Sequence, residues 1–242
     1  MRRSSILDFY NPFLVVAIYP LLAYLLGDPA AFKWGLDHGA EPMPEAAELR
    51  TQRNGRLLWI LRYVILSAYV LYGLRVTSIP KGTPIQSAIV GIIVGIALVQ
   101  VRLLAIKVWP DLGFANAAHP ALLGPIGVWA AIIALGGFSE ELWRAFCLVS
   151  LRRVGASTEA TVLGTSVVFA LSELGGRPSR ISSQREELVF TVLVGVCLAG
   201  LFLTFRSLTM IISANIVYNG LSFYRLRRDE GLAISKLPPN NA

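Results

Sequence analysis

Long apolar runs separated by short polar stretches dominate the chain. A bilayer core about 30 Å thick needs about 20 apolar residues in a crossing helix. Runs that approach or reach this length lie at 9–26, 57–76, 84–106, 121–138, 159–174, 188–205 and 208–224. The pattern predicts an all-α polytopic bundle of membrane helices, forming a single membrane domain over 1–242 with a polar C-terminal tail at 225–242.

The segment 139–154 (SEELWRAFCLVSLRRV) decides the number of crossings. It follows the Gly136-Gly137 pair, which could end the preceding helix, and Ser139 could cap a new one. If the segment does not cross, the chain has seven spans and its termini lie on opposite sides. If it crosses, there are eight spans, and more of the flanking Lys and Arg face the cytoplasm. The positive-inside bias therefore favours about eight helices with both termini cytoplasmic.

The composition agrees with a membrane protein. Hydrophobic residues make up 55% of the chain and charged residues 15%, against about a quarter charged in soluble domains, and the mean hydropathy is +0.60. These values exclude a soluble enzyme, a disordered protein and a compact nucleic-acid-binding protein. The net charge of +7 comes from basic clusters beside apolar runs, which favours membrane lipids as partners and no nucleic acid.

Several groups in or near the apolar runs have an ordinary explanation. Arg62, Arg75, Arg102 and Lys107 lie within reach of a predicted span end, where long basic side chains extend to the headgroups. Tryptophans near the boundaries, such as Trp143, are typical interface anchors. His38 and His119 have no second His or Cys at ligand spacing, so neither a metal nor another cofactor is expected.

The stretch GGFSEELWRAF carries an acidic pair and a base inside an apolar region. On a helix, Arg144 lies four residues from Glu140 and three from Glu141, so it can pair with either carboxylate. Ionisable groups at membrane depth are expensive and mark candidate functional sites. The alternative is that the two glutamates lie at a helix N-terminus, where their negative charge interacts favourably with the helix dipole.

Two further polar positions lie on later helices. Glu173 ends a long uncharged run and either pairs with Arg177 or Arg180 at the interface or points inward toward Glu140. Asn215 and Asn219 are four apart and share one helix face. Amides in apolar surroundings need partners, and interhelical hydrogen bonds are the simplest ones.

These three stretches, in this order, resemble the CPBP family of intramembrane proteases, which includes the type II CAAX prenyl endopeptidases and bacterial proteins linked to bacteriocin processing. The family pattern is EExxxR, FxxxH and HxxxN or HxxxD on separate helices. The matching stretches are Glu140-Glu141-Leu142-Trp143-Arg144 (one residue short), Phe169-Ala170-Leu171-Ser172-Glu173 and Asn215-Ile216-Val217-Tyr218-Asn219. The resemblance covers about residues 120–224.

The resemblance implies an intramembrane endopeptidase of a bacterial inner membrane. Glu140 would activate the water that attacks the scissile amide, with Glu141 and Arg144 as its supports. Glu173, Asn215 and Asn219 would occupy the positions that hold the water and stabilise the oxyanion. The substrate would be a membrane-anchored peptide or protein, often with a prenylated C-terminus.

Both motif histidines are replaced here, and the replacement leaves three hypotheses. An ionised glutamate cannot donate a hydrogen bond as imidazole does, so Glu173 could help only if it were protonated, for example by sharing a proton with Glu140. Asn215 could still donate through its amide. Without activity, the chain would be a family member that binds a partner, as a subunit of a larger membrane complex. A transporter that uses the carboxylates as a proton relay is the third hypothesis, and the lack of an obvious inverted repeat counts against it.

Overall fold

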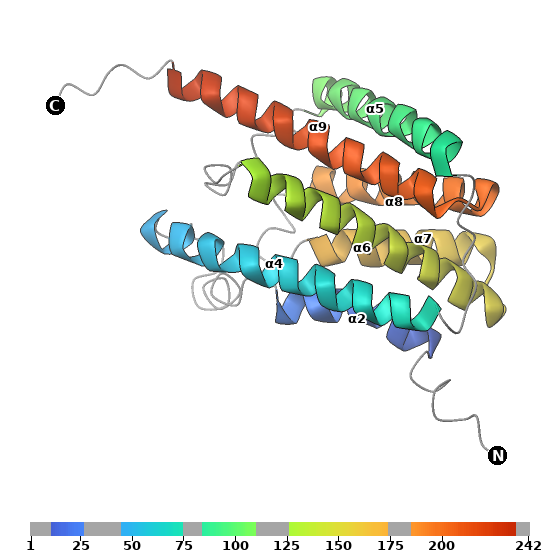
Figure 1. The fold of residues 1–242 in the computed structure, drawn as a ribbon. Coiled ribbons are helices and arrows are strands. Elements are labelled where there is room, and N and C mark those ends of the chain that lie inside the picture. The colour runs from blue at the N-terminus through green and yellow to red at the C-terminus, as the bar shows by residue number, and fades with distance from the viewer. Residues whose placement is uncertain (1–10, 27–44, 75–83, 110–125, 174–184, 236–242) are drawn as a thin grey trace.

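The computed structural model describes residues 11–26, 45–74, 84–109, 126–173 and 185–235. These residues form α-helices and no strands, which confirms the all-α prediction (Figure 1). The helices are α2 Pro12–Leu25, α4 Glu45–Leu74, α5 Pro84–Val108, α6 Ile126–Arg153, α7 Thr158–Glu173, α8 Arg185–Phe205 and α9 Leu208–Ser235.

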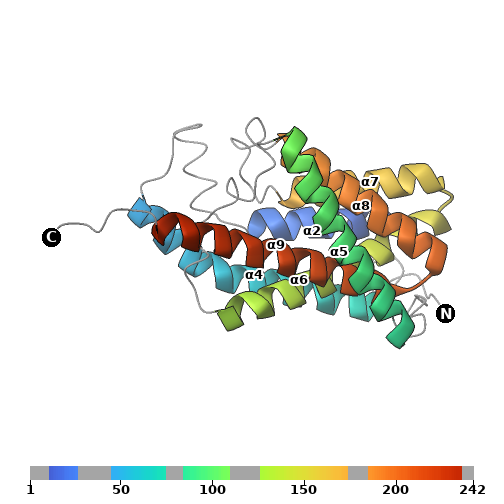
Figure 2. The same ribbon diagram turned by 90° about the horizontal axis from the view of Figure 1, so that it is seen from above.

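The helices pack in two layers. One layer holds α4, α6, α9 and α5 in that spatial order, and the other holds α2, α7 and α8 (Figures 1 and 2). Helix α6 is central, because it packs against both neighbours in its own layer, α4 and α9, and against all three helices of the other layer. A side chain on α6 can therefore meet groups from five other helices.

The predicted break at Gly136-Gly137 is wrong, because α6 continues through both glycines as one helix of 28 residues. Both glycines are buried within α6, and their missing side chains let neighbouring helices approach closely. The segment 139–154 is thus the second half of α6 and its end, and no eighth helix occurs among the described residues. Successive helices run in alternate directions, so α2 starts at the opposite end of the bundle from the end of α9 (Figure 1).

The outer surface of the bundle is apolar, as a lipid environment requires. Three helices are long and apolar enough to cross a membrane, at Pro84–Val108, Ile126–Arg153 and Leu188–Phe205. Shorter apolar helical segments lie at Pro12–Ala23 and Leu57–Gly73. On α5, Ile85, Ile89 and Ile93 are exposed at helical spacing, whereas Gly91 and Gly95 face α9 so closely that a Cβ on either would collide with its backbone.

Polar caps lie at the starts of α2 and α9. Asn11 caps α2 by accepting a hydrogen bond from the amide of Phe13 at 2.9 Å, and Pro12 follows in the first turn. Between α8 and α9, Arg206 adopts a φ of 51° and Ser207 accepts from the amide of Met210 at 3.3 Å. The short connection places α9 back against α6, α5 and α8.

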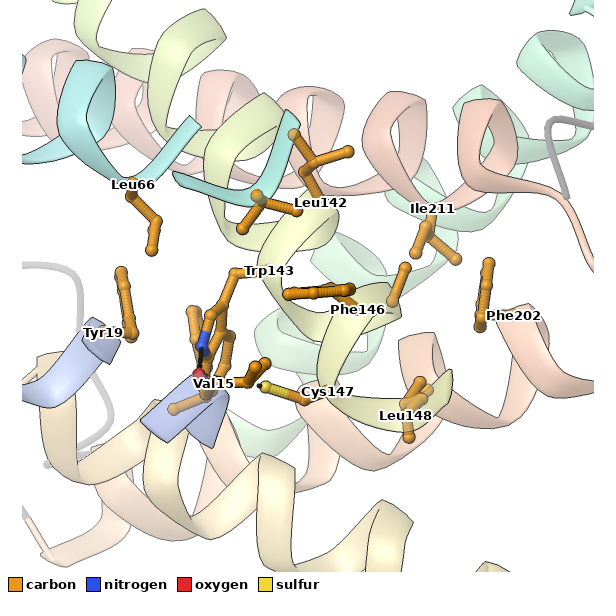
Figure 3. Packing of buried hydrophobic residues seen from close by; sticks show 14 of the residues in the cluster. Val15, Tyr19, Leu66, Leu142, Trp143, Phe146, Cys147, Leu148, Phe202 and Ile211 are labelled. Atoms are coloured by element: carbon orange, nitrogen blue, oxygen red, sulfur yellow. Dashed lines mark hydrogen bonds between the residues drawn. The ribbon is translucent and has the colours of Figure 1, made fainter. Parts of the chain in front are cut away.

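The main apolar core joins α2, α4, α6, α7, α8 and α9 (Figure 3). Trp143 is fully buried there and donates its indole N–H to the carbonyl of Val15 at 2.8 Å, so it is a core residue and its prediction as an interface anchor is wrong. Trp143 also packs against Tyr19, with ring centroids 5.0 Å apart. These contacts fix α2 against α6 one turn away from the acidic pair.

Candidate active site

Glu140 lies near the middle of α6 with only 4% of its surface exposed. Its Oε1 accepts hydrogen bonds from the phenol groups of Tyr63 at 3.1 Å and Tyr19 at 3.3 Å. Its Oε2 lies 3.4 Å from the side-chain amide of Asn215. Donors from α2, α4 and α9 therefore surround a single carboxyl group, as a buried charge in an apolar setting requires.

Glu141 and Arg144 form a fully buried pair on the same helix. Nε and Nη2 of Arg144 donate to the two carboxylate oxygens of Glu141 at 2.9 and 3.2 Å, a bidentate geometry. Of the two pairings open to Arg144 by spacing, the structure thus has the one with Glu141. The guanidinium also lies over the ring of Phe169, 4.4 Å from its centroid.

Asn215 connects α9 to both glutamates. Its amide nitrogen donates to Oε1 of Glu141 at 2.6 Å, and the amide of Asn219 donates to Oδ1 of Asn215 at 2.5 Å. The second bond orients the Asn215 side chain with its nitrogen toward α6. The predicted shared face of the two asparagines is therefore a hydrogen-bonded chain that ends at the acidic pair.

Glu173, the last residue of α7, points toward the same cluster. Its Oε1 accepts a hydrogen bond from Tyr19 at 2.6 Å and lies 3.6 Å from Nη2 of Arg62. Its side chain is 40% exposed, unlike that of Glu140. Tyr19 has a single hydroxyl proton within reach of both carboxylates. Tyr19 thus links Glu173 to Glu140. Arg177 and Arg180, the other predicted partners of Glu173, lie outside the described residues.

Sequence reasoning did not single out Tyr19 or Tyr63 of this cluster, and it assigned the third residue, Arg62, to the headgroups. Arg62 is only 5% exposed, so the prediction that it extends to the headgroups is wrong. Its Nη2 donates to the hydroxyls of Tyr63 at 2.9 Å and Tyr19 at 3.3 Å. The available signal was a charged residue within an apolar run, which also applied to Arg102, likewise buried and bonded to Tyr218 at 2.8 Å.

The described part of the chain contains no cluster of side chains that could bind a metal ion. Those residues contain no group of three or more His, Cys, Asp or Glu that could hold an ion. His38 and His119 lie outside the described ranges. The site that the described residues do form consists of carboxylates, amides, phenols and guanidinium groups.

The fold and this cluster define an all-α membrane protein with a polar site built around a buried glutamate. Residues 122–221 match the family model described as Type II CAAX prenyl endopeptidase Rce1-like. The matched region contains all three sequence motifs, and the predicted resemblance to the CPBP family is confirmed over this region. Comparison with curated proteins and with solved structures gives no match.

Proposed function

We propose that the protein is an intramembrane endopeptidase in which Glu140 is the general base. The observation that carries the proposal is the surroundings of Glu140, a carboxyl group buried between membrane helices with donors on both of its oxygens. A carboxylate in this setting is held in one orientation without a direct basic partner. It remains able to accept a proton from water.

The reaction needs only groups of this chain and one water molecule. Glu140 takes a proton from the water as the water oxygen bonds to the scissile carbonyl carbon, and the C=O electron pair moves onto the carbonyl oxygen. When the tetrahedral intermediate collapses, the C–N bond breaks and Glu140 returns the proton to the leaving nitrogen. Each transfer uses the same carboxyl group, first as base and then as acid.

The remaining motif residues position this group. The bidentate bond from Arg144 compensates the charge of Glu141, and Asn215 links that pair to Glu140. Asn219 sets the orientation of the Asn215 amide. Glu173 lies on the more exposed side of the cluster, bonded to Tyr19, and would exchange protons between Glu140 and the outside when protonated.

The membrane setting and the family match support a substrate class and a location for this proposal. The substrate is a membrane-anchored peptide or protein, because the site lies between helices whose outer faces are apolar. A prenylated C-terminus fits the description of the matched family. The location is a bacterial inner membrane, and the chain from 1 to 242 acts as one membrane domain.

A second function, a binding subunit without catalysis, has one observation in its favour. The hydroxyls of Tyr19 and Tyr63 occupy bonding positions around Oε1 of Glu140, where an attacking water would also need to lie. A permanently closed site of this kind would keep the fold and lose the chemistry. The protein would then serve as a structural part of a membrane complex.

Cleavage assays separate the two functions. Wild type, Glu140→Gln and Glu173→Gln are reconstituted in vesicles and given lipid-anchored peptides with and without a prenylated C-terminus. Catalysis predicts cleavage by wild type, its loss in Glu140→Gln and a smaller reduction in Glu173→Gln. Equal product from all three proteins would refute the role of these carboxylates and favour the binding subunit.

A further inference from the structure

Glu173 and Asn215 replace the motif histidines, and a cluster from α2 and α4 offers further hydrogen-bond donors beside Glu140. Arg62 and the two phenols that it contacts, Tyr19 and Tyr63, are all buried within hydrogen-bond reach of one another. Both phenols also contact Oε1 of Glu140. All three lie outside the residues matched by the family model.

Arg62 has donor capacity that nothing in the described residues uses. Its Nη2 serves the two phenol oxygens and faces Glu173, but its Nε–H is buried without a hydrogen-bond partner. Leaving a charged donor buried and unpaired costs free energy. A carbonyl or oxyanion oxygen of a bound ligand could accept this Nε–H and would remove that cost.

The guanidinium also makes the phenols better donors. Each phenol oxygen accepts a hydrogen bond from Arg62 and donates its own proton to a carboxylate, and chains of this kind strengthen each bond. A carbonyl that approaches a water on Glu140 comes close to the same hydroxyl protons. In an apolar site, positive charge and preorganised donors stabilise a developing oxyanion far more than they would in water.

We propose that Arg62, Tyr63 and Tyr19 form the oxyanion site of the reaction, in place of the absent motif histidines. The inference rests on the proposed endopeptidase function. During attack, the C=O electron pair moves onto the carbonyl oxygen. The Arg62 guanidinium and the phenol O–H groups then stabilise the negative charge on that oxygen. Glu140 holds the proton of the water at that stage and later gives it to the leaving nitrogen, so the donors gain and lose no proton.

The first experiment measures cleavage of a lipid-anchored peptide by Tyr63→Phe and Arg62→Gln in vesicles. The phenylalanine keeps the packing of the ring and removes only the hydroxyl, and the amount of folded protein is measured alongside. Removal of one oxyanion donor lowers kcat by about a hundredfold to a thousandfold in other enzymes. We expect a fall in kcat with little change in KM, partly restored in Arg62→Lys. Tyr224→Phe and Arg153→Gln, which change exposed residues, are the matched controls and keep wild-type rates.

The second experiment uses binding and does not depend on turnover. The probes are a lipid-anchored peptide with a phosphinate in place of one amide, which mimics the tetrahedral oxyanion, and its amide twin. We expect Arg62→Gln to weaken phosphinate binding at least tenfold while amide binding stays the same. If wild type does not cleave but Arg62→Gln selectively loses phosphinate binding, the endopeptidase function and the oxyanion role both fail, and the three residues form an anion-binding site without catalysis.

The opposite results overturn the oxyanion site alone or both proposals together. Glu140-dependent cleavage with wild-type kcat in Arg62→Gln and Tyr63→Phe overturns the site and leaves the endopeptidase function in place. A kcat loss that comes with an equal loss of amide binding or of folded protein indicates a structural role and also overturns it. Absence of cleavage together with equal binding of both probes by wild type overturns both.

Discussion

The side-chain amide of Asn215 lies 2.6 Å from Oε1 of Glu141 and 3.4 Å from Oε2 of Glu140. Helix α9 is thus tied most closely to the glutamate that pairs with Arg144, and only weakly to the proposed base. The charged pair and the amide form a support on one side of Glu140. The phenols and Arg62 approach from α2 and α4.

Replacing Asn215 should cost more stability than replacing Asn219. Asn215→Leu removes a hydrogen bond to a buried carboxylate, which is worth about 1.5–3 kcal/mol, whereas Asn219→Leu removes a neutral bond worth about 1 kcal/mol. Thermal unfolding of both variants in the same detergent measures the order. A larger loss in Asn219→Leu would show that the close contact with Glu141 does not stabilise α9.

Breaking the buried ion pair should be severe, and removing both of its charges should be milder. Arg144→Met leaves the Glu141 carboxylate unpaired at zero exposure, which costs about 3–5 kcal/mol. Adding Glu141→Gln removes that charge, so the double variant should recover part of the loss. Thermal unfolding of the two single variants and the double variant gives the coupling energy. Additive losses would contradict a direct pairing.

A methyl group at Gly137 should force α6 and α9 apart. A Cβ there would lie 2.7 Å from Cγ1 and 3.2 Å from the backbone nitrogen of Ile216, the neighbour of Asn215. Gly137→Ala should therefore cost about 1–3 kcal/mol and lower the cleavage rate. Gly127→Ala on the same helix meets no atom within 4 Å and should gain up to about 1 kcal/mol from helix propensity. Equal unfolding temperatures would argue against close packing at Gly137.

The alternate course of the helices predicts that the two termini lie on opposite sides of the membrane. The sequence-based prediction of two cytoplasmic termini required an eighth span, and the segment assigned to it is the second half of α6. Short helices such as α7, with 16 residues, can cross where the bilayer thins locally. Side-specific reporters fused to each terminus measure the orientation, and signals from the same side would disprove an odd number of crossings.

The apolar runs predicted the helices well, because lipid exposure requires apolar side chains around most of each helix. The pattern could not predict whether Gly136 and Gly137 end a helix, since that depends on Tyr63 and Ile216 packing against them. The spacing on the helix allowed Arg144 to pair with either glutamate. In the structure, Arg144 pairs with Glu141, and Asn215 on α9 also donates a hydrogen bond to that glutamate.

The site itself was predictable only in its motif half. The ordered motifs identified Glu140, Glu141, Arg144, Glu173 and the two asparagines, which the structure brings together. The other half could not be found, because Tyr19 and Arg62 belong to helices without a motif. A single arginine near the end of an apolar run fits either a headgroup contact or a buried pair. Only the packing of α4 against α6 and α2 distinguishes these cases.

The hydrogen-bond partners of Glu140 come from distant parts of the chain, which matters for the expression of fragments. A fragment restricted to 122–221 would keep every motif residue but would lack the two phenols that contact Oε1 of Glu140 and the Arg62 guanidinium that contacts these phenols. In such a fragment, the Glu140 carboxyl would lack its phenol partners and face lipid. Its reactivity would therefore differ from that in the longer chain. Helices α2 and α4 are therefore structural components of the immediate environment of Glu140, and assays need a chain that includes both.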